Sequence, residues 1–288
     1  MARRAMPEPA VQRVTAEDLA LVLDAHRGEK ALQDAVERAA LPSSGPAALL
    51  SVLARFIQFN AAFGAGLANL AGEIAARPTL FLDAEEPVRI LADRAADVAA
   101  DFFYAAVDEF DDRLTPWRDT HRTLAQATLK GLGAHFGYSP AQLNDVLRIN
   151  PATEAARTAV WEGYGVGERL EEARLFSAMG FHAGSEVLAD HEFTVIDRCL
   201  RARRPELVKA LEETAVEVLG HRHNAYYWIR IHTSVETEHF EAALKGVNNA
   251  LRFYAGGESP ATVKGWILDG FRRFAQVQGE FMERLADQ

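Results

Sequence analysis

Helical patterning of apolar residues extends over most of this chain and constrains its fold more than any other feature. Alanine is abundant, β-branched residues are sparse, and no alternating apolar and polar run bounded by turns stands out. Such a pattern favours α-helices, because a half-buried strand needs a period of two. In the segment 86–112 the apolar residues form one continuous stripe at helical spacing: Val88, Leu91, Ala95, Val98, Phe102, Ala106 and Phe110. The sequence therefore predicts an all-α fold.

Proline and glycine divide this pattern into about eight to ten predicted helices. A segment at 168–199 is expected as one helix or as two with a kink, because Gly180 and Gly184 weaken its centre. Residues 221–224 are expected to form a break or a bend. We predict a single helical bundle over 46–288, with 1–45 as an N-terminal helical appendage. The other long helices are expected at 47–76, 86–112, 117–136, 225–254 and 262–285.

Composition limits the partners of such a bundle. The chain has 288 residues, 49% of them hydrophobic, so it can bury a large core. Its 41 acidic and 31 basic residues give a net charge of -10, which disfavours binding to nucleic acid or to an anionic membrane. We therefore expect a small molecule or a protein as partner.

The N-terminus and the cysteine content point to the cytoplasm. A single cysteine, Cys199, excludes an intramolecular disulfide framework and a thiolate metal cluster, and it fits a reducing compartment. The sequence MPEP at 6–9 stands where a signal peptide would need an apolar run. No stretch is expected to span a bilayer, because polar residues interrupt even the apolar region 48–76.

Three side chains near the C-terminus are spaced like metal ligands on one helix. His232, Glu236 and His239 stand at i, i+4 and i+7, which places them within about 60° of arc on a helix. Glu238 falls on the opposite side. The alternative is a solvated polar face with two incidental histidines, because short polar patterns recur by chance. Partners elsewhere in the chain decide between these interpretations.

Such partners are present in two other segments. Glu186 lies in an otherwise small and apolar stretch, where an unpaired carboxylate is costly to bury. Glu109 lies near the end of the apolar stripe, and His121 follows twelve residues later. Taken singly, each also fits a surface position: Glu186 beside a packing glycine, Glu109 at a solvated helix end.

The ordered set resembles the heme-oxygenase-like diiron oxidases over roughly residues 102–254. The segments that carry the resemblance are VDEFDD with HRTLAQATLKGLGAHFG, SAMGFHAGSE, and IHTSVETEH leading into FEAALKG. The resemblance implies a heme-oxygenase-like bundle with two Fe(II) ions, or manganese, bridged by Glu186, and O2 as co-substrate. Carried over by position, it implies six metal ligands: Glu109, His121, Glu186, His232, Glu236 and His239.

This chain departs from the family pattern at three places. Glu236 stands where aspartate is more usual, so its binding mode is open. The interval between Glu109 and His121 is long, which leaves Asp112 as a competitor for the first carboxylate. His182 and His191 flank Glu186 by about one turn each, either as hydrogen-bond donors that orient a metal ligand or as extra ligands.

The resemblance leads to a hypothesis of function. We expect an oxidase that acts on a small aliphatic amino acid in natural-product biosynthesis, similar to a branch that forms aziridines from isoleucine or valine. Amine N-oxygenation on the same metal scaffold is the first alternative. A metal-free relative that degrades thiamin is another and would need Cys199 as nucleophile. A helical interaction protein without chemistry is the last.

Substrate contacts and assembly are less constrained. Arg122, Arg198 and Arg230 are candidates for binding a substrate carboxylate, although surface positions would also suit them. The helix predicted at 262–285 either covers the bundle or forms a homodimer contact. Aromatic residues near the proposed ligands line a pocket or belong to the core: Phe102, Phe103, Phe181, Tyr226, Tyr227 and Trp228.

Overall fold

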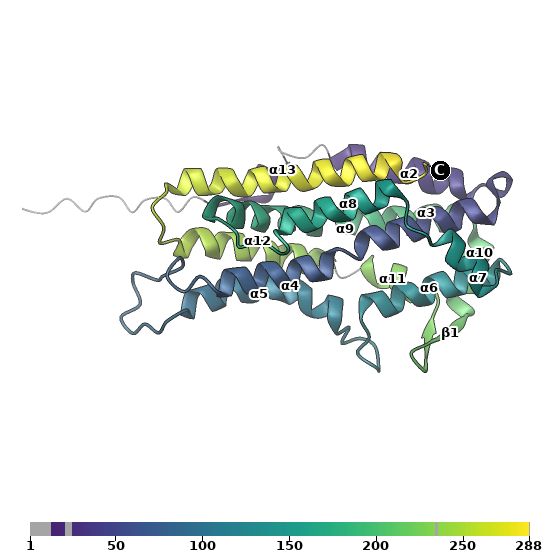
Figure 1. Cartoon of the computed structure of the whole chain (residues 1–288), viewed down its shortest axis with the longest axis horizontal. Helices are drawn as coiled ribbons and strands as arrows, with labels where there is room; N and C mark the ends of the chain where they lie inside the picture. The colour runs from purple at the N-terminus through teal and green to yellow at the C-terminus, as the bar shows by residue number, and fades with distance from the viewer. Residues whose placement is uncertain (1–12, 21–24, 234–235, 288) are drawn as a thin grey trace, which may run out of the picture.

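The computed structural model in Figure 1 describes residues 13–20, 25–233 and 236–287. Most helices in this part of the chain run along one long axis, and a small hairpin projects near one end. The predicted all-α bundle is confirmed, with the hairpin as an addition. In chain order the elements are α1 (Ala16–Ala20), α2 (Ala25–Ala40), η1 (Pro42–Ser44), α3 (Gly45–Asn60), α4 (Phe63–Ala75), α5 (Asp93–Phe110), α6 (His121–His135), α7 (Pro140–Val146), α8 (Pro151–Tyr164), α9 (Glu172–Arg203), α10 (Pro205–Glu213), β1 (Ala215–Val218), β2 (His221–Asn224), α11 (Tyr227–His232), α12 (Glu236–Phe253) and α13 (Pro260–Arg284).

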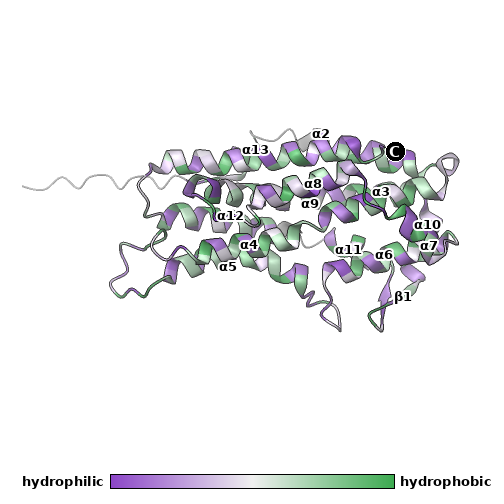
Figure 2. Ribbon diagram, viewed as in Figure 1, coloured by the Kyte–Doolittle hydropathy of each residue, from purple (hydrophilic) through white to green (hydrophobic). Residues whose placement is uncertain are grey.

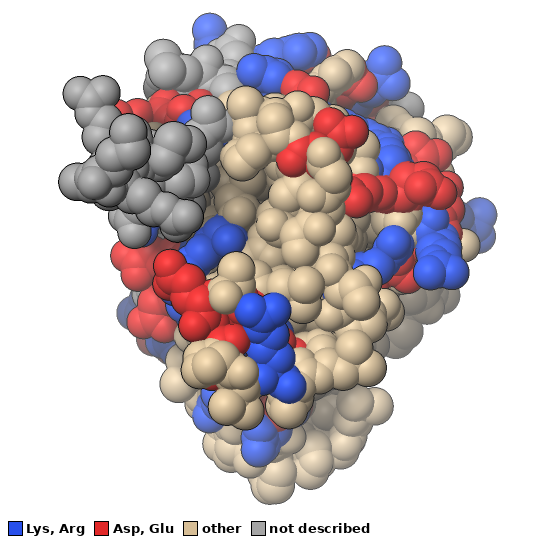
Figure 3. All heavy atoms as spheres, turned by 90° about the vertical axis from the view of Figure 1, so that its left-hand side faces the viewer, with Lys and Arg blue, Asp and Glu red and all other residues tan. Residues whose placement is uncertain are grey.

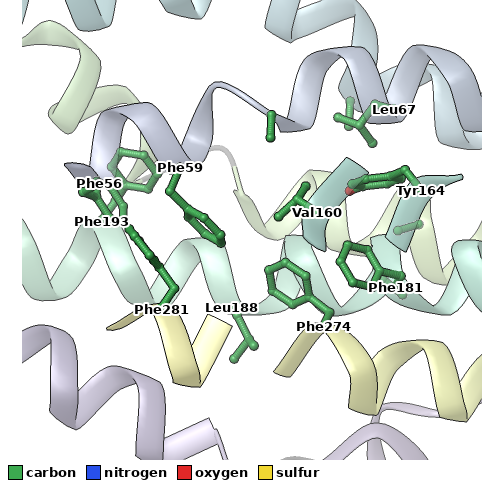
Figure 4. Close-up of a cluster of buried hydrophobic side chains, with 14 of the residues drawn as sticks. Phe56, Phe59, Leu67, Val160, Tyr164, Phe181, Leu188, Phe193, Phe274 and Phe281 are labelled. Carbon is green, nitrogen blue, oxygen red and sulfur yellow. The ribbon is translucent and has the colours of Figure 1, made fainter. Parts of the chain in front are cut away.

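Helix α9 is the centre of the bundle. Helices α2, α8, α11, α12 and α13 all pack against it. Apolar and polar residues alternate around the outer helices, as Figure 2 shows, so each turns an apolar side inward. An aromatic cluster fills the middle of the bundle (Figure 4), where Phe59 stacks on Phe281 with ring centroids 4.2 Å apart. Burial of such rings is the main contribution to the stability of the fold.

Two glycines let α9 and α13 approach each other closely. A Cβ added at Gly180 would lie 1.8 Å from the carbonyl oxygen of Ile267, and one at Gly270 would lie 1.7 Å from that of Ser177. Neither distance is compatible with a side chain. The sequence predicted either one helix or two with a kink near Gly180, and the structure has one helix, α9, over Glu172–Arg203. Packing against α13 stabilises the helix despite its central glycines.

The helix predicted at 47–76 is two helices, α3 and α4, joined at residues 61–62. By length and composition alone, the stretch Pro42–Ala75 is one that could cross a membrane, the only such stretch in the described residues and contrary to our expectation. In the structure, 56% of its most apolar window is buried. Its apolar character is therefore that of a core segment.

Helix α5 begins later than predicted. It starts at Asp93, and Val88 and Leu91 lie in the preceding loop with 77% and 78% of their surface exposed. Pro87 in this loop lacks a backbone N–H and disfavours the helical conformation of the residue before it. The first two residues of the predicted stripe were therefore assigned wrongly. Figure 3 views the molecule from the end at which this loop lies and shows a broad uncharged surface with acidic and basic groups on either side of it.

The expected break at 221–224 is a strand. Strands β1 and β2 pair antiparallel, with Val216 opposite His223. The turn between them consists of Leu219 and Gly220, which have φ angles of 52° and 81°. Two residues with positive φ are typical of the type I′ turn of a tight hairpin. The sequence His-Arg-His-Asn has no apolar alternation, so the pattern search missed this strand.

Both ends of the described chain pack on the bundle. Helix α2 lies against α9 and α13 and buries Leu32 and Val36 completely. Part of the predicted appendage thus shares the common core, and a domain boundary at residue 45 stays a prediction. The apolar side of α13, including Phe271 and Phe274, is also buried within the chain. It is not available to a second copy, so the predicted homodimer has no assigned surface.

Candidate metal site

The end of α5 and the start of α6 bring Glu109 and His121 together. The loop between them turns the chain back, and the hydroxyl of Thr120 caps α6 by accepting from the N–H of Thr123. His121 thereby occupies the first position of α6, where only 4% of it is exposed. Its Nδ1 lies 3.1 Å from Glu109 Oε1. Although burial on its own raises the pKa of Glu109, His121 lowers it below the usual value.

His232 joins this pair from α11. Its Nδ1 lies 2.7 Å from the carbonyl oxygen of Trp228, and because a carbonyl only accepts, Nδ1 carries the proton. The Nε2 lone pair therefore faces His121 Nδ1, at 3.2 Å. Burial, and then the neighbouring His121, lower the pKa of His232 to about 3. A neutral imidazole with an oriented lone pair is the form in which histidine binds a metal.

Glu109, His121 and His232 form a group in which one donor atom from each lies within 4.8 Å of the others. It is the one such group of three or more in the described part of the chain. One carboxylate and two imidazoles suit iron, manganese or zinc. The three residues fit a divalent metal ion by donor type, by distance and by the tautomer of His232.

A second group of polar side chains lies beside this triad. Glu186 projects from α9 with 6% of its surface exposed, and its Oε2 lies 3.6 Å from His239 Nδ1. The other ring nitrogen of His239, Nε2, lies 3.0 Å from Asp108 Oδ2. A histidine held by a carboxylate at one nitrogen presents the other to a metal in a fixed orientation. The hydrogen bond with His239 lowers the pKa of Asp108 despite the opposing effect of burial.

Asp108 is a functional candidate that the sequence analysis did not single out. It stands among four carboxylates in five residues, where a solvated helix end is the simpler interpretation. Asp108 is distinguished from the neighbouring carboxylates by its contact with His239, which stands 131 residues later in the chain.

Helices α11 and α12 carry the predicted ligand series, but not on one continuous helix. Helix α11 ends at His232 and α12 begins at Glu236, so His232 and His239 project from two different helices. The single-stripe geometry expected from the spacing is therefore wrong, although both histidines reach the same cavity. The side chain of Glu236 lies outside the described residues, and its role stays a prediction.

Both groups open into one cavity. The space that the centre of a water-sized sphere can occupy is about 40 Å³, which holds about three waters or comparable small ligands. Apolar side chains also contribute to its lining. The lining residues are Asn60, Phe63, Leu67, Ala105, Glu109, His121, Ser185, Glu186, Ala189, Glu192, Phe193, His232, His239 and Phe274.

Glu192 is a third carboxylate in this lining and was also missed by the sequence analysis. Only 3% of it is exposed, and its Oε1 accepts a hydrogen bond of 2.9 Å from Gln278 Nε2 on α13. Glu192 stands six residues after Glu186, which is not a helical repeat of the same stripe. Spacing alone therefore could not have connected the two.

Several other candidates lie away from the cavity. Asp112 is buried, but its Oδ1 accepts from the N–H of Leu114 within the loop after α5. The ring of His191 is exposed on the outer side of α9, where Nδ1 lies 3.9 Å from Glu29. Neither belongs to the ligand group. His182 is completely buried beside Glu186, and burial lowers its pKa.

The predicted substrate contacts are not in the lining either. Arg122 donates to the carbonyl of Ile57, Arg198 donates to Gln33, and Arg230 lies over the ring of Tyr227. The aromatic residues of the cavity wall are Phe63, Phe193 and Phe274, and none of the six candidates lines it. Four of the six belong to the core, which was the other expectation: Phe102, Phe181, Tyr226 and Trp228. Cys199 is buried outside the cavity, and burial raises the pKa of its thiol. A thiolate nucleophile at this site is therefore not supported.

Comparison with known proteins supports the fold. No family model and no curated protein sequence matches this chain. Among solved structures, a TenA homologue from Pseudomonas syringae pv. tomato str. DC3000 is similar, with a TM-score of 0.53. The match covers 97% of this chain and 94% of that chain, at 12% sequence identity. The bundle is thus a heme-oxygenase-like fold of the TenA kind, as expected from the resemblance.

Proposed function

We propose that this chain is a nonheme diiron oxidase that uses O2 to oxidise a small aliphatic amino acid. The observation that carries the proposal is the convergence of two His/Glu groups on one buried cavity. Glu109, His121 and His232 form one group, and Glu186 with His239 borders it. Carboxylate and imidazole donors without thiolate favour iron or manganese.

The residues of the site have separate tasks in this proposal. Glu109, His121 and His232 would hold one ion, while Glu186 and His239 would hold the second, with Glu236 completing the predicted set. Asp108 keeps the ring of His239 oriented. Two iron(II) ions bound there would supply two of the four electrons that reduce O2 to water, and oxidation of the substrate would supply the other two. Phe63, Phe193 and Phe274 exclude bulk water from the reacting atoms.

One carboxylate of the cavity is available in this proposal to bind a substrate amino group. Its lining contains the carboxylates of Glu109, Glu186 and Glu192 and no lysine or arginine. With Glu109 and Glu186 used as metal ligands, Glu192 is the lining carboxylate placed to bind an ammonium group. The cavity lining offers no cationic side chain for a substrate carboxylate, so the expected arginine partner is not part of this proposal.

Binding as an ammonium also bears on which atom is oxidised. A protonated nitrogen has no lone pair to accept oxygen, so a substrate bound to Glu192 in that form would be attacked at a C–H bond. This favours desaturation over N-oxygenation, and closure of an aziridine ring, which forms a C–N bond with the nitrogen lone pair, requires the ammonium group to lose its proton first. N-oxygenation requires the amine to bind unprotonated, and it remains the second candidate on the same metal scaffold.

Anaerobic loading with Fe(II), followed by exposure to O2 with isoleucine or valine, tests the proposal. We expect about two irons per chain and an O2 uptake that the amino acid accelerates. Mass spectrometry separates the two candidates, because desaturation or aziridine formation removes two hydrogens while N-oxygenation adds one oxygen.

Matched variants make the assignment specific. His232→Ala and Glu186→Ala should lose iron, whereas His191→Ala, on the exposed side of the same α9 helix as Glu186, should not. Wild-type protein with less than about one metal per chain, and equal metal content in all variants, would rule out the dimetal proposal.

A further inference from the structure

His182 lies one helical turn before Glu186 on α9 and is completely buried. Three oxygen atoms surround its Nδ1. Glu186 Oε1 lies 3.2 Å away, the hydroxyl of Tyr164 lies 3.4 Å away, and that of Ser185 lies 3.5 Å away. None of the functions assigned above uses this histidine.

The hydroxyl hydrogens around His182 can be assigned one by one. Ser185 donates to the backbone carbonyl of His182 at 2.7 Å, so its oxygen is an acceptor for Tyr164 at 2.9 Å. Both hydroxyl hydrogens are then committed to those bonds. All three oxygens around Nδ1 face it as acceptors, which places the ring proton of His182 on Nδ1. An Nδ1–H group at 3.2 Å from Oε1 attracts the carboxylate of Glu186.

The neighbours of His182 fix its ring in place. The ring of Tyr164 packs closely against α4, because a Cβ added at Gly66 would lie 2.3 Å from it. Phe102 contacts His182 from α5, with ring centroids 5.5 Å apart. Burial raises the pKa of Tyr164 well above its usual value, so its hydroxyl stays a donor. His182 is thus held by side chains from α5 and α8 as well as by its own helix.

The other ring nitrogen of His182, Nε2, does not explain why a histidine stands at this position. Nε2 is buried and has no hydrogen-bond partner among the described residues. A histidine kept only for packing would leave both of its polar atoms without a use, and an apolar side chain of similar size would be more stable. The contacts of Nδ1 are therefore the reason for a histidine at this position.

We propose that His182 is a positioning residue for Glu186: its Nδ1–H fixes Oε1, so that Oε2 faces His239 and the ion bound there. This inference rests on the proposed metal site. Oε1 of Glu186 lies 3.2 Å from Nδ1 of His182, and Oε2 lies 3.6 Å from Nδ1 of His239. In this inference Oε1 binds His182, and Oε2 is left for the ion. The ion at the Glu109–His121–His232 triad does not depend on this contact.

A titration of the metal-free protein with Co(II), followed by visible absorption, tests the inference. Wild type is compared with His182→Leu, which removes the donor, and with His182→Asn, whose amide N–H takes the place of Nδ1–H. We expect His182→Leu to weaken binding of the second equivalent about 10- to 100-fold and to alter its absorption bands. The first equivalent should stay within about twofold of wild type, and His182→Asn should restore the second.

His191→Leu is the matched control on the same helix, and thermal unfolding of each variant is recorded in parallel. Wild-type affinity for both equivalents in His182→Leu would overturn the inference. Equal weakening of both equivalents without recovery in His182→Asn would also overturn it, because the residue would then support the whole bundle. If wild type itself binds no cobalt, the proposed function fails and this inference fails with it.

Discussion

His232 Nε2 lies 3.2 Å from His121 Nδ1, although 111 residues separate the two in the chain. Each ring has a further polar contact, at the other nitrogen of His232 and at the same Nδ1 atom of His121. Trp228 accepts from His232, and Glu109 lies against His121. Two imidazoles and a carboxylate in this arrangement are preorganised for one ion.

Replacement of His232 by alanine should lower the affinity for the first metal ion by at least about 100-fold. The reason is that His232 contributes the one donor whose lone pair is already oriented by a buried hydrogen bond. Isothermal titration with Mn(II) or Zn(II) measures the effect. His223→Ala is the control for loss of a buried histidine outside the cavity, and an equal loss of affinity in both variants would contradict the assignment.

The stability of the metal-free protein should fall as the pH decreases from about 6.5 towards about 3. His232 has a folded-state pKa of about 3 against the ordinary value of 6.5, so the unfolded chain takes up a proton that the folded chain does not. The contribution of His232 to the free energy of unfolding is fully present above the pKa that it has in the unfolded chain. Below that pKa the contribution falls by about 1.4 kcal/mol for each pH unit. Urea unfolding in the presence of a chelator measures this slope, and His232→Leu should reduce it.

Glu192→Gln should leave metal binding intact and weaken binding of the substrate amine by about 10-fold or more. The substitution keeps the size of the side chain and removes its charge. Binding of isoleucine to the metal-loaded protein, measured by calorimetry, tests the claim. Loss of metal in this variant would instead identify Glu192 as a ligand, and unchanged amino-acid affinity would remove it from the substrate site.

Gly180→Ala should destabilise the fold by about 1–3 kcal/mol or more, because its new methyl group would overlap the backbone of α13. Separation of α9 from α13 would also displace Glu186 on the same helix. Gly72→Ala is the matched control, since a Cβ there meets no atom within 4 Å. Thermal unfolding of the two variants gives the comparison, and equal stability would show that the helices adjust without cost.

The fold was predictable from the sequence where apolar spacing dominated. Helix α9 lies within about four residues of its predicted bounds at each end. The role of Gly180 as a close contact with α13 could not be predicted, because the sequence does not show which helix packs there. The start of α5 was placed too early, because Val88 and Leu91 continue the apolar spacing although their side chains face solvent. A helical pattern records residue types, and burial depends on what packs against them.

The candidate site was predictable in part for a related reason. Glu109, His121 and His232 were chosen by their order, and the structure brings them together. Asp108 and Glu192 were missed because their partners, His239 and Gln278, lie far away in the sequence. The order of residues along the chain found ligands that stand on three different helices, whereas tertiary contacts select the residues that orient them.

The break between α11 and α12 gives the metal a second role. Since His232 and His239 belong to separate helices, and their partners to α5, α6 and α9, each ion of the proposed site would cross-link several helices of the bundle. An ion that binds the folded chain and not the unfolded one adds its binding free energy to the stability of the fold. Metal bound at the proposed site would therefore protect the folded chain against proteolysis, in addition to supporting its activity.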